Sequence, residues 1–565
     1  MKTTHLGLLF PLVVSGCFWA LPVPRALADY TWNLPTGDWF TATNWNPQTL
    51  PTSADAVTIS NNSSVTISTA GSTAMAGPLF VGYPAGTSSL LISGGSALND
   101  TYAEIGISGL GYGTGSVTVD NGTWNNNTGV LAVGFGAYGT LTITNNSLVT
   151  SGNATLAQGT DSTATVTMNS GTWNANRPGA FSQLGAGGTA TMNLNGGTFN
   201  IYDGSVGALG TGTMNVNGGT FNSTSHIYVG GYNYFGTAHA GNGTMTVTNG
   251  TATDYDGVIG DGGTGIVTIG TGGKWTNSDA LFVGNRTTGS LKIVANGIVT
   301  VTSSSGTLTV GNLAGSQGTL QIGDSDAFTG TLTAKVITGG AGTAKMILAQ
   351  TNGFTLSSAL TGSLSLQQTG AGTTTLTAAA NQNTYTGGTI ITSGKLMVNS
   401  TAGTGTGAVE VQSSGAIGGT GSITGALTID GGGALAPGSA NFTTNGGISL
   451  LDNAKIVFTL GTTSDKVTDN GALTLGQNVT LALTPGSGFG VGTYSLINFT
   501  GGLTDNSSSF SGWSVAGLPG AYTANFTMVG SSLKLNVTNV PEPGSTTALA
   551  LGLTICIGHW RRRRL

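Results

Sequence analysis

Charge, cysteine and proline are all scarce in this chain of 565 residues. Charged residues make up 7%, there are 14 prolines, and the two cysteines are Cys17 and Cys556. Because both cysteines lie in terminal segments, the chain between them can build neither a disulfide framework nor a cysteine-based metal site. The low proline count argues against an extended proline-rich stalk.

The few charges are also unevenly placed. Acidic residues number 21 and basic residues 16, and six of the basic residues lie in the terminal segments. The main body of the chain is therefore acidic and carries no basic patch, so nucleic acid is not expected as a partner.

Small polar residues take the place of the missing charges. Glycine alone accounts for 97 residues without the strict three-residue period of collagen, and 38% of the chain is hydrophobic. No helical period is found between the termini. The composition therefore predicts an all-β protein with very many turns around an apolar core.

A short apolar segment that ends in glycine recurs through the first half of the chain. One glycine from each copy gives the series Gly82, Gly106, Gly134, Gly159, Gly185, Gly207, Gly230, Gly260, Gly284 and Gly311. The spacing runs from 22 to 30 residues and averages near 25. Internal repetition at this period indicates a solenoid or a stacked array.

Each repeat contains an alternating strand, then an Asn/Gly turn and a short further strand, as in GSVTVDNG followed by TWN. Alternation places Val117 and Val119 on one face and Thr118 on the other. Leucine-rich repeats carry a different consensus and propeller blades are longer, so three strands in about 25 residues indicate one coil of a β-helix. We predict a right-handed parallel β-helix, whose ten repeats stack into a rod roughly 50 Å long.

The repeat register predicts two details of packing. The residues that follow the turn in each unit should form one inward column: Leu98, Trp124, Leu148, Trp173, Phe199, Phe221, Trp275 and Val299. Alignment of VIGDGGTG with FVGNRTTG places Asp261 beside Arg286 of the next coil, as an exposed ion pair.

Three tryptophans, Trp32, Trp39 and Trp45, precede the first alternating strand. A carbohydrate-stacking site is one interpretation. We favour an aromatic N-terminal cap, because a solenoid must cover its terminal coil.

The start of the chain is typical of a secretory signal. Lys2 precedes an apolar stretch, and Ala26-Leu27-Ala28 forms a small-x-small cleavage pattern, so Asp29 is expected to begin the mature chain. The alternative is a lipoprotein signal, because Val14-Ser15-Gly16-Cys17 resembles a lipobox, in which Cys17 is lipidated.

The end of the chain has three parts in order. Pro541, Glu542 and Pro543 come first, an apolar segment of 16 residues runs from Ser545 to Trp560, and four arginines follow: Arg561, Arg562, Arg563 and Arg564. The segment is shorter than the roughly 20 residues of an untilted transmembrane helix. The positive-inside rule would keep the arginines cytoplasmic, so a short membrane anchor is one interpretation.

Together these three parts resemble the PEP-CTERM sorting signal. The resemblance implies recognition of the Pro-Glu-Pro motif by exosortase, a transient stay in the inner membrane through the C-terminal helix, and delivery to the cell surface or extracellular matrix. It also implies a bacterium that makes exopolysaccharide.

The segment GAGTTTLTAAANQNTYTGGTIITSGKLMVN resembles the autotransporter-associated β-strand repeat. The matching residues are Gly370, Gly372, Leu376, Asn383, Tyr385, Gly387, Gly388, Thr389, Gly394, Leu396 and Val398. The 25-residue units resemble the PEP-CTERM-associated repeat of autotransporter passengers. The longer strands after Phe442 are interpreted as a β-rich cap or a small sandwich.

These observations divide the chain into six parts. They are a signal peptide (1–28), an N-terminal cap with the first strands (29–78), a β-helix (79–325), autotransporter-associated repeats (326–440), a β-rich C-terminal region (441–539) and a sorting signal (540–565).

Few residues point to catalysis or metal binding. Glycoside hydrolysis needs two carboxylates a few ångströms apart, and Glu104 and Glu410 are the only glutamates between Asp29 and Val540. Asp254, Asp256 and Asp261 are a weak candidate for Ca²⁺ binding through oxygen ligands. We favour solvated turn acids, and expect no metal or cofactor.

The longest repeat holds the candidate binding loop, HIYVGGYNYFGTAHAGNG. Its aromatic and imidazole residues are His226, Tyr228, Tyr232, Tyr234 and His239. A loop packed by its own aromatic side chains is the alternative.

The sequence thus predicts an exported, non-enzymatic structural or adhesive protein of the cell surface or exopolysaccharide matrix, which hydrogen-bonds glycans. The alternative is a polysaccharide-binding or polysaccharide-degrading β-helix enzyme. An autotransporter passenger would require a C-terminal membrane barrel, where this chain has the sorting tail.

Overall fold

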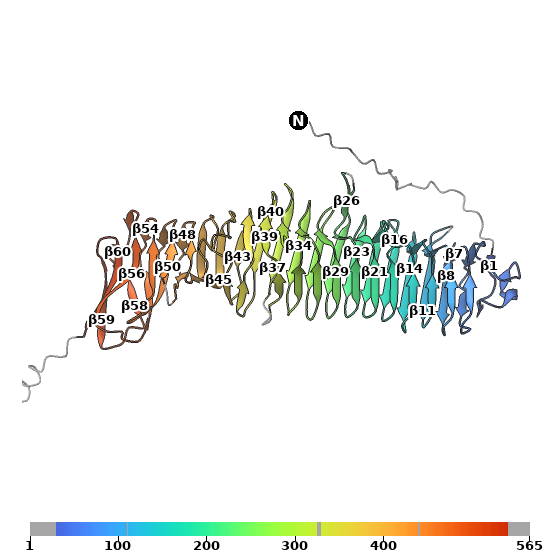
Figure 1. The fold of residues 1–565 in the computed structure, drawn as a ribbon, viewed down its shortest axis with the longest axis horizontal. Helices are drawn as coiled ribbons and strands as arrows, with labels where there is room; N and C mark the ends of the chain where they lie inside the picture. Colours follow the sequence, from blue (N-terminus) through green and yellow to red (C-terminus); the bar gives the residue numbers. More distant parts are fainter. Residues whose placement is uncertain (1–29, 110, 235, 325–328, 439–440, 541–565) are drawn as a thin grey trace, which may run out of the picture.

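The computed structural model describes residues 30–109, 111–234, 236–324, 329–438 and 441–540. They form a long all-β rod, a parallel β-solenoid of about 18 coils (Figure 1). Cys17, the cleavage site at Ala28 and Asp29, and the tail from Pro541 to Leu565 lie outside the described residues. Within the described ranges, no helix is long and apolar enough to cross a membrane.

One coil consists of three strands that lie in three different sheets. β10 (Tyr102–Ile107) lies in sheet A, β11 (Gly113–Asp120) in sheet B and β12 (Thr123–Asn125) in sheet C. β13 (Val130–Phe135) then begins the next coil and pairs in parallel with β10. The predicted parallel β-helix is therefore confirmed.

Sheet A has 15 strands. In spatial order they are β3 (Trp45–Asn46), β1 (Tyr30–Trp32), β4 (Val57–Ile59), β7 (Pro78–Val81), β10, β13, β16 (Asn153–Gln158), β19 (Phe181–Leu184), β22 (Asp203–Val206), β25 (His226–Val229), β30 (Asp256–Ile259), β33 (Leu281–Val283), β36 (Thr307–Val310), β39 (Val336–Gly339) and β42 (Ala359–Gly362).

Sheets B and C run beside sheet A along the rod. Sheet C contains β6 (Thr73–Met75), β9 (Ala97–Asn99), β12, β15 (Leu148–Thr150), β18 (Thr172–Ala175), β21 (Thr198–Ile201), β24 (Thr220–Ser223), β29 (Thr251–Asp254), β32 (Lys274–Asn277), β35 (Ile298–Val301) and β38 (Thr331–Thr333). The early strands of sheet B are β2 (Thr36–Asp38), β5 (Ser64–Ile67), β8 (Gly86–Ser93), β11, β14 (Tyr138–Thr144), β17 (Thr163–Met168), β20 (Thr189–Leu194), β23 (Thr211–Val216), β28 (Asn242–Val247), β31 (Gly265–Ile269), β34 (Thr288–Ile293), β37 (Gln317–Ile322) and β40 (Thr343–Leu348).

Alternation along each strand divides the core from the surface. In β11, Val117 and Val119 are buried and Thr118 is partly exposed. The inward residues of successive coils stack on one another at the spacing of neighbouring strands, about 4.8 Å. One continuous apolar core therefore runs along the rod.

The repeat glycines occupy a backbone conformation that requires glycine. All ten glycines of the series from Gly82 to Gly311 have positive φ, for example +70° at Gly106. A Cβ at Gly106 would lie 1.9 Å from the carbonyl oxygen of Tyr138. Each glycine of the series therefore lies at a corner of a coil, where the backbone turns and packs closely against the backbone of the next coil.

The predicted inward column is correct in seven of its eight members. Leu98, Trp124, Trp173, Phe199, Phe221, Trp275 and Val299 have no exposed side-chain surface. Leu148 is wrong, because it is 39% exposed and its neighbour Val149 pairs with Trp124 and Trp173. Ala252 completes the column between Phe221 and Trp275.

The error at Leu148 arises from the length of one turn. In the turn before β15, two consecutive asparagines, Asn145 and Asn146, have positive φ. In the corresponding turn before β12, Asn121 alone has positive φ. The extra residue shifts the strand by one position, and such a shift moves each side chain to the opposite face.

Each tryptophan of this column donates its indole N–H to a polar residue one coil earlier. Trp124 donates to Asp100 (2.8 Å), Trp173 to Ser151 (3.0 Å) and Trp275 to Asp254 (2.5 Å). Phe199 and Phe221 need no acceptor, and on the coil before each of them the position of the acceptor is occupied by an apolar residue, Ala175 and Ile201 respectively. These three polar residues thus satisfy the indole groups of the inward column.

Amide ladders on the surface also join successive coils. In sheet C, Asn222 donates to Asn200 (2.8 Å) and Asn200 donates to Asn174 (2.7 Å). Neighbouring strands bring identical residues face to face, so each amide is both donor and acceptor. The abundant asparagine therefore stabilises the stack as well as the turns.

The N-terminal end of the rod contains a tryptophan cluster. Trp32, Trp39 and Trp45 are at most 2% exposed, and Trp45 contacts the other two rings edge to face at 4.9 and 4.7 Å. Rings this buried cannot stack on a sugar from solvent, so the carbohydrate interpretation of these residues is wrong.

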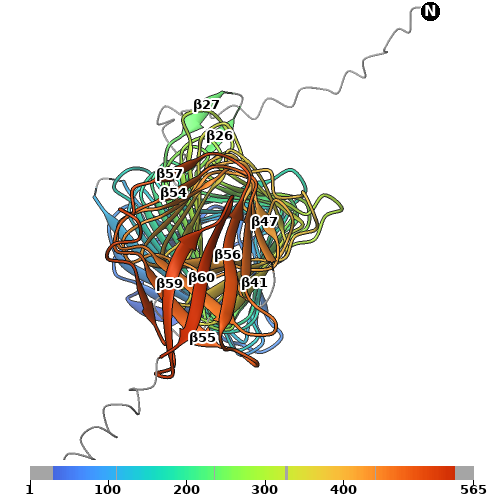
Figure 2. The same ribbon diagram turned by 90° about the vertical axis from the view of Figure 1, so that its left-hand side faces the viewer.

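The C-terminal region continues the solenoid. β50 (Asn441–Thr444), β53 (Lys466–Asp469) and β56 (Gly492–Phe499) stack in parallel, so this region is not a small sandwich. β60 (Ser532–Asn539) then pairs with β56 and β59 (Tyr522–Met528) in antiparallel fashion. Figure 2 shows these strands at the end of the rod that faces the viewer.

Candidate functional site

A hairpin interrupts the regular coils at the longest repeat. β26 (Tyr232–Tyr234) and β27 (Thr237–His239) pair in antiparallel fashion and project from the side of the rod (Figures 1 and 2). The hairpin lies in the chain between β25 of sheet A and β28 of sheet B. The projecting loop expected from the repeat length is therefore present.

The base of the hairpin carries a cluster of rings. Tyr232 stacks on His239 with ring centroids 4.3 Å apart and an angle of 3° between the planes. Tyr232 also contacts Phe181 of β19 at 4.6 Å, and Tyr228 of β25 lies 6.3 Å from Phe181. The alternative of a loop packed by its own aromatic residues is thus only part of the arrangement, because Phe181 comes from two coils earlier.

A polar side chain of sheet A holds the hairpin in place. Gln183 of β19 donates from Nε2 to the hydroxyl oxygen of Tyr232 at 3.1 Å. At the far side of the base, Asn233 donates its backbone N–H to Asp261 at 2.6 Å. The ring cluster is therefore fixed to the rigid sheet, although it begins in a loop.

Carboxylates flank the ring cluster on sheet A. His226 Nε2 lies 3.3 Å from Asp256 Oδ2, and His226 Nδ1 lies 3.6 Å from Asp203 Oδ2. These residues come from the adjacent strands β22, β25 and β30. The imidazole of His226 lies 5.8 Å from the ring of Tyr228, so the charged residues and the rings form one continuous site.

The electrostatic environment of this site is negative. The hydrogen bond with Asp203 is the largest cause that raises the pKa of His226, and Asp203, Asp256 and Asp254 raise it further by their charge. Burial, followed by the charges of Asp203, Asp261 and Asp256, raises the pKa of Tyr228 to about 12. The site therefore favours a positive charge over a negative one.

Burial gives His239 the opposite behaviour. Its pKa is lowered, because desolvation disfavours the charged imidazole. His239 beside Tyr232 thus loses its proton more readily than an ordinary imidazole, whereas His226 retains a proton more readily.

The structure divides the three aspartates of the calcium candidate among three environments. Asp254 points into the core, where burial raises its pKa to about 8. Asp256 lies beside His226, and Asp261 accepts hydrogen bonds from Asn233 and Asn285 and an ion pair from Arg286. Among the described residues, no group of three or more acidic, histidine or cysteine side chains is arranged to hold a metal ion.

The predicted pair of Asp261 and Arg286 is confirmed, with 3.1 Å between Asp261 Oδ1 and Arg286 Nε. Its exposure is not as expected, because the Asp261 side chain is only 4% exposed while that of Arg286 is 48% exposed. Asp261 accepts two further hydrogen bonds beneath the hairpin, which explains its burial.

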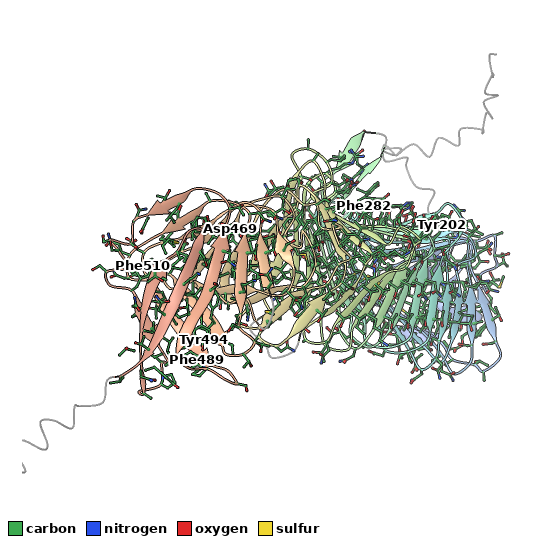
Figure 3. The ribbon with its side chains drawn as sticks, turned by 60° about the vertical axis from the view of Figure 1, so that its left-hand side comes forward. Tyr202, Phe282, Asp469, Phe489, Tyr494 and Phe510 are labelled. Carbon is green, nitrogen blue, oxygen red and sulfur yellow. The ribbon has the colours of Figure 1, made fainter. Side chains whose placement is uncertain are left out.

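Sequence reasoning identified the loop and missed its partners on the sheet. Phe181, Gln183 and Asp203 lie one or two repeats before the loop, and only the strand register brings them to it. Tyr234 is described by its backbone in β26 and not by its side chain. Figure 3 labels Tyr202 and Phe282 on the side of the rod from which the hairpin projects.

The outer face of sheet A also carries an aromatic hollow away from the hairpin. A hollow of about 350 Å³ lies over β10, β13 and β16, and its lining includes Tyr102, Glu104, Phe135 and Gln158. Glu104 lies in β10, and Glu410 lies much later, in β46 (Val409–Gly418). The outer face of sheet A thus places rings beside carboxyl and amide groups at two points along the rod.

A larger groove of about 880 Å³ lies between sheets C and A farther along the rod. Its lining contains Thr300, Thr302, Ser303, Lys335 and Gln382, and no carboxylate is among the described residues that line it. Acid–base hydrolysis of a glycoside requires a pair of carboxyl groups, so this groove offers binding groups without that pair.

Comparison of the chain with models of known protein families and with curated proteins found no match.

Proposed function

We propose that this protein is an exported, non-enzymatic β-solenoid that serves as a structural and adhesive rod at the cell surface or in the exopolysaccharide matrix. It binds polysaccharide through the outer face of sheet A around the hairpin. The observation that carries this proposal is the ring cluster of Phe181, Tyr228 and Tyr232 beside Asp203 and Asp256.

Sugar recognition combines two kinds of contact that this site provides. The apolar faces of pyranose rings pack on aromatic rings, and their hydroxyl groups hydrogen-bond to carboxylates and amides. Both kinds of group stand on strands that the stacked coils hold rigid, which limits the entropy lost on binding. The continuous sheet of 15 strands also lets an extended polymer lie across several coils.

The experiment is binding of the purified solenoid, residues 29–540, to a panel of bacterial exopolysaccharides on an immobilised surface. Tyr232→Ala removes the central ring and should weaken binding by about tenfold. Tyr138→Ala removes an exposed tyrosine, 52% exposed, from sheet B and is the matched control. Equal binding by the two variants would contradict the location of the site, and no binding to any glycan would contradict the adhesive role.

The same samples test the enzyme alternative. Appearance of new reducing ends on incubation with the polysaccharides, lost in Asp203→Asn or Asp256→Asn, would replace the structural role with glycoside cleavage.

The sorting role of the two ends belongs to this proposal. The resemblance to the PEP-CTERM signal supports it. Exosortase cuts the chain at Pro541, Glu542 and Pro543 on the outer side of the inner membrane. The four arginines, Arg561, Arg562, Arg563 and Arg564, stop translocation because charged groups cross hydrocarbon at high cost.

Two further parts of the proposal concern the solenoid itself. The buried tryptophans at its N-terminal end support the proposal that they cap the first coil. A right-handed coil is the sense expected for parallel crossover connections.

The tail is tested by mass spectrometry of the mature C-terminus after cell fractionation. Glu542→Ala should leave uncut precursor in the inner membrane, and replacing the four arginines with serine should release unsorted precursor to the periplasm. A surface protein that still carries Trp560 would show a simple anchor instead.

A further inference from the structure

We propose that the site at the hairpin selects amine-bearing glycans, that is, polymers that contain free hexosamine units, over acidic and fully acetylated polysaccharides. This inference rests on the proposed function, because it names the class of polysaccharide that the site binds.

The first argument is the balance of charge around the rings. Asp203 and Asp256 stand on the exposed face of sheet A, with side chains 23% and 16% exposed. Arg286 is paired with Asp261 at 3.1 Å, so its charge is already compensated there. His226 lies between the two carboxylates and compensates at most one negative charge.

The second argument is that the carboxylates retain bonding capacity toward a ligand. Oδ1 of Asp256 accepts the backbone N–H of Ala280 at 2.9 Å, which fixes the carboxylate and leaves Oδ2 directed to His226. The side chains of Asp203 and Asp256 are themselves 23% and 16% exposed, so a second cation can approach these carboxylates from solvent. Partly desolvated carboxylates bind an ammonium group more strongly than water-exposed ones.

The third argument is the position of the rings. Tyr228 lies 5.8 Å from His226 and 6.1 Å from Tyr232, so the aromatic surface extends directly from the carboxylates. A pyranose ring on Tyr228 would therefore carry its amino group toward Asp203 or Asp256, while the next sugar of the chain could pack on Tyr232. An ammonium over an aromatic face gains additional attraction from the ring.

The same charges exclude the other classes of polymer. A uronate carboxylate would meet Asp203 and Asp256, whose two charges His226 compensates only in part, and like charges at short range oppose binding. An acetylated sugar has no charge, so it can stack on the rings and donate hydrogen bonds but forms no ion pair with the carboxylates. The expected order of affinity is amine, then acetylated amine, then uronate.

The test uses three oligosaccharides of equal length, namely hexamers of β-1,4-glucosamine, of N-acetylglucosamine and of galacturonate, with the solenoid 29–540 at pH 6 in isothermal titration calorimetry. We expect the glucosamine hexamer to bind about tenfold more tightly than the acetylated hexamer. This preference should shrink as salt is raised from 50 to 500 mM, because added ions screen the attraction.

Two double variants isolate the role of the carboxylates. Asp203→Asn/Asp256→Asn removes both charges and should make the affinities for the glucosamine and acetylated hexamers equal. Asp452→Asn/Asp505→Asn removes the same net charge from elsewhere on the rod and should keep the preference. Far-ultraviolet circular dichroism and the melting temperature show that each variant is folded.

The outcomes separate the two proposals. Equal affinity for the amine and acetylated hexamers, tightest binding of galacturonate, or a preference that survives Asp203→Asn/Asp256→Asn would overturn the inference while sugar binding stands. Failure of all three hexamers and of the whole exopolysaccharides to bind would overturn the proposed function as well.

Discussion

The two buried aspartates of the core should make the solenoid more stable in acid than at alkaline pH. Asp100 and Asp254 are 5% and 3% exposed, and each accepts the indole N–H of a tryptophan on the next coil. Burial raises the pKa of each carboxyl to about 8 from an ordinary value of 3.8. In the folded protein both side chains are therefore neutral over most of the physiological range.

The sign and size of the effect follow from proton linkage. Below pH 3.8 both the folded and the unfolded chain hold these protons, so neither site destabilises the fold. Between pH 4 and 8 the unfolded chain releases them and the folded chain keeps them, so the free energy of unfolding falls as pH rises. Each tenfold difference in proton affinity between the folded and the unfolded chain is worth about 1.4 kcal/mol. Between pKa values of 3.8 and about 8, the free energy of unfolding therefore falls by up to about 6 kcal/mol per site.

Other titratable groups also change the free energy of unfolding with pH, some in the same direction and some in the opposite one. A variant is therefore needed to isolate the effect of the two aspartates. The pKa of His226 is also raised, and its contribution is likewise lost as pH rises through that pKa, whereas the lowered pKa of His239 opposes it. Burial also raises the pKa of Asp469. Asp100→Asn/Asp254→Asn keeps an acceptor for each indole and removes only the two titrations under test.

The assay is urea unfolding followed by tryptophan fluorescence at pH 4, 5, 6, 7 and 8. We expect the wild-type midpoint to fall across this range, and the double variant to have a flatter profile and to exceed the wild type at pH 8. Asp161→Asn, at an exposed turn position, should leave the wild-type profile unchanged. A wild-type and double variant with parallel profiles would refute the reasoning.

Two further predictions concern packing and are measured by the same unfolding assay. Trp173→Ala removes a fully buried ring and its hydrogen bond to Ser151, and should lower the free energy of unfolding by about 3 to 5 kcal/mol. Leu148→Ala removes a side chain that is 39% exposed, and should lower it by less than about 1 kcal/mol. Equal costs would show that Leu148 faces inward. Gly106→Ala should destabilise the protein by at least about 2 kcal/mol more than Gly179→Ala, because both residues have positive φ but a Cβ meets a backbone oxygen only at Gly106. Similar midpoints for the two alanine variants would contradict the close contact at the corner.

The sequence by itself was sufficient to determine the architecture of the rod. Corners that need positive φ demand glycine, and strands with one buried face demand alternation, so both features recur at the length of one coil. The glycine series, the seven correct residues of the inward column and the pair of Asp261 and Arg286 follow from that local chemistry.

The corners between sheets also explain why the sequence could not predict whether certain side chains point into the core or to the surface. Asp254 and Asp256 are two residues apart, and simple alternation would place them on the same face. The chain turns at Tyr255 between sheets C and A, which sends Asp254 into the core and Asp256 to the surface beside His226. Leu148 was misplaced for the same reason, because one more residue in the preceding turn shifts β15 by one position and so exchanges the inward and outward side chains.

Only the tertiary structure assembled the candidate site. Phe181, Gln183 and Asp203 are 23 to 45 residues from His226 in the chain, and no local pattern links them to the hairpin. The stacking of coils brings them together, because each coil adds one strand to sheet A whatever the number of residues in its loops. Local backbone preferences therefore determined the repeat, whereas the register between coils decided which side chains of different repeats meet.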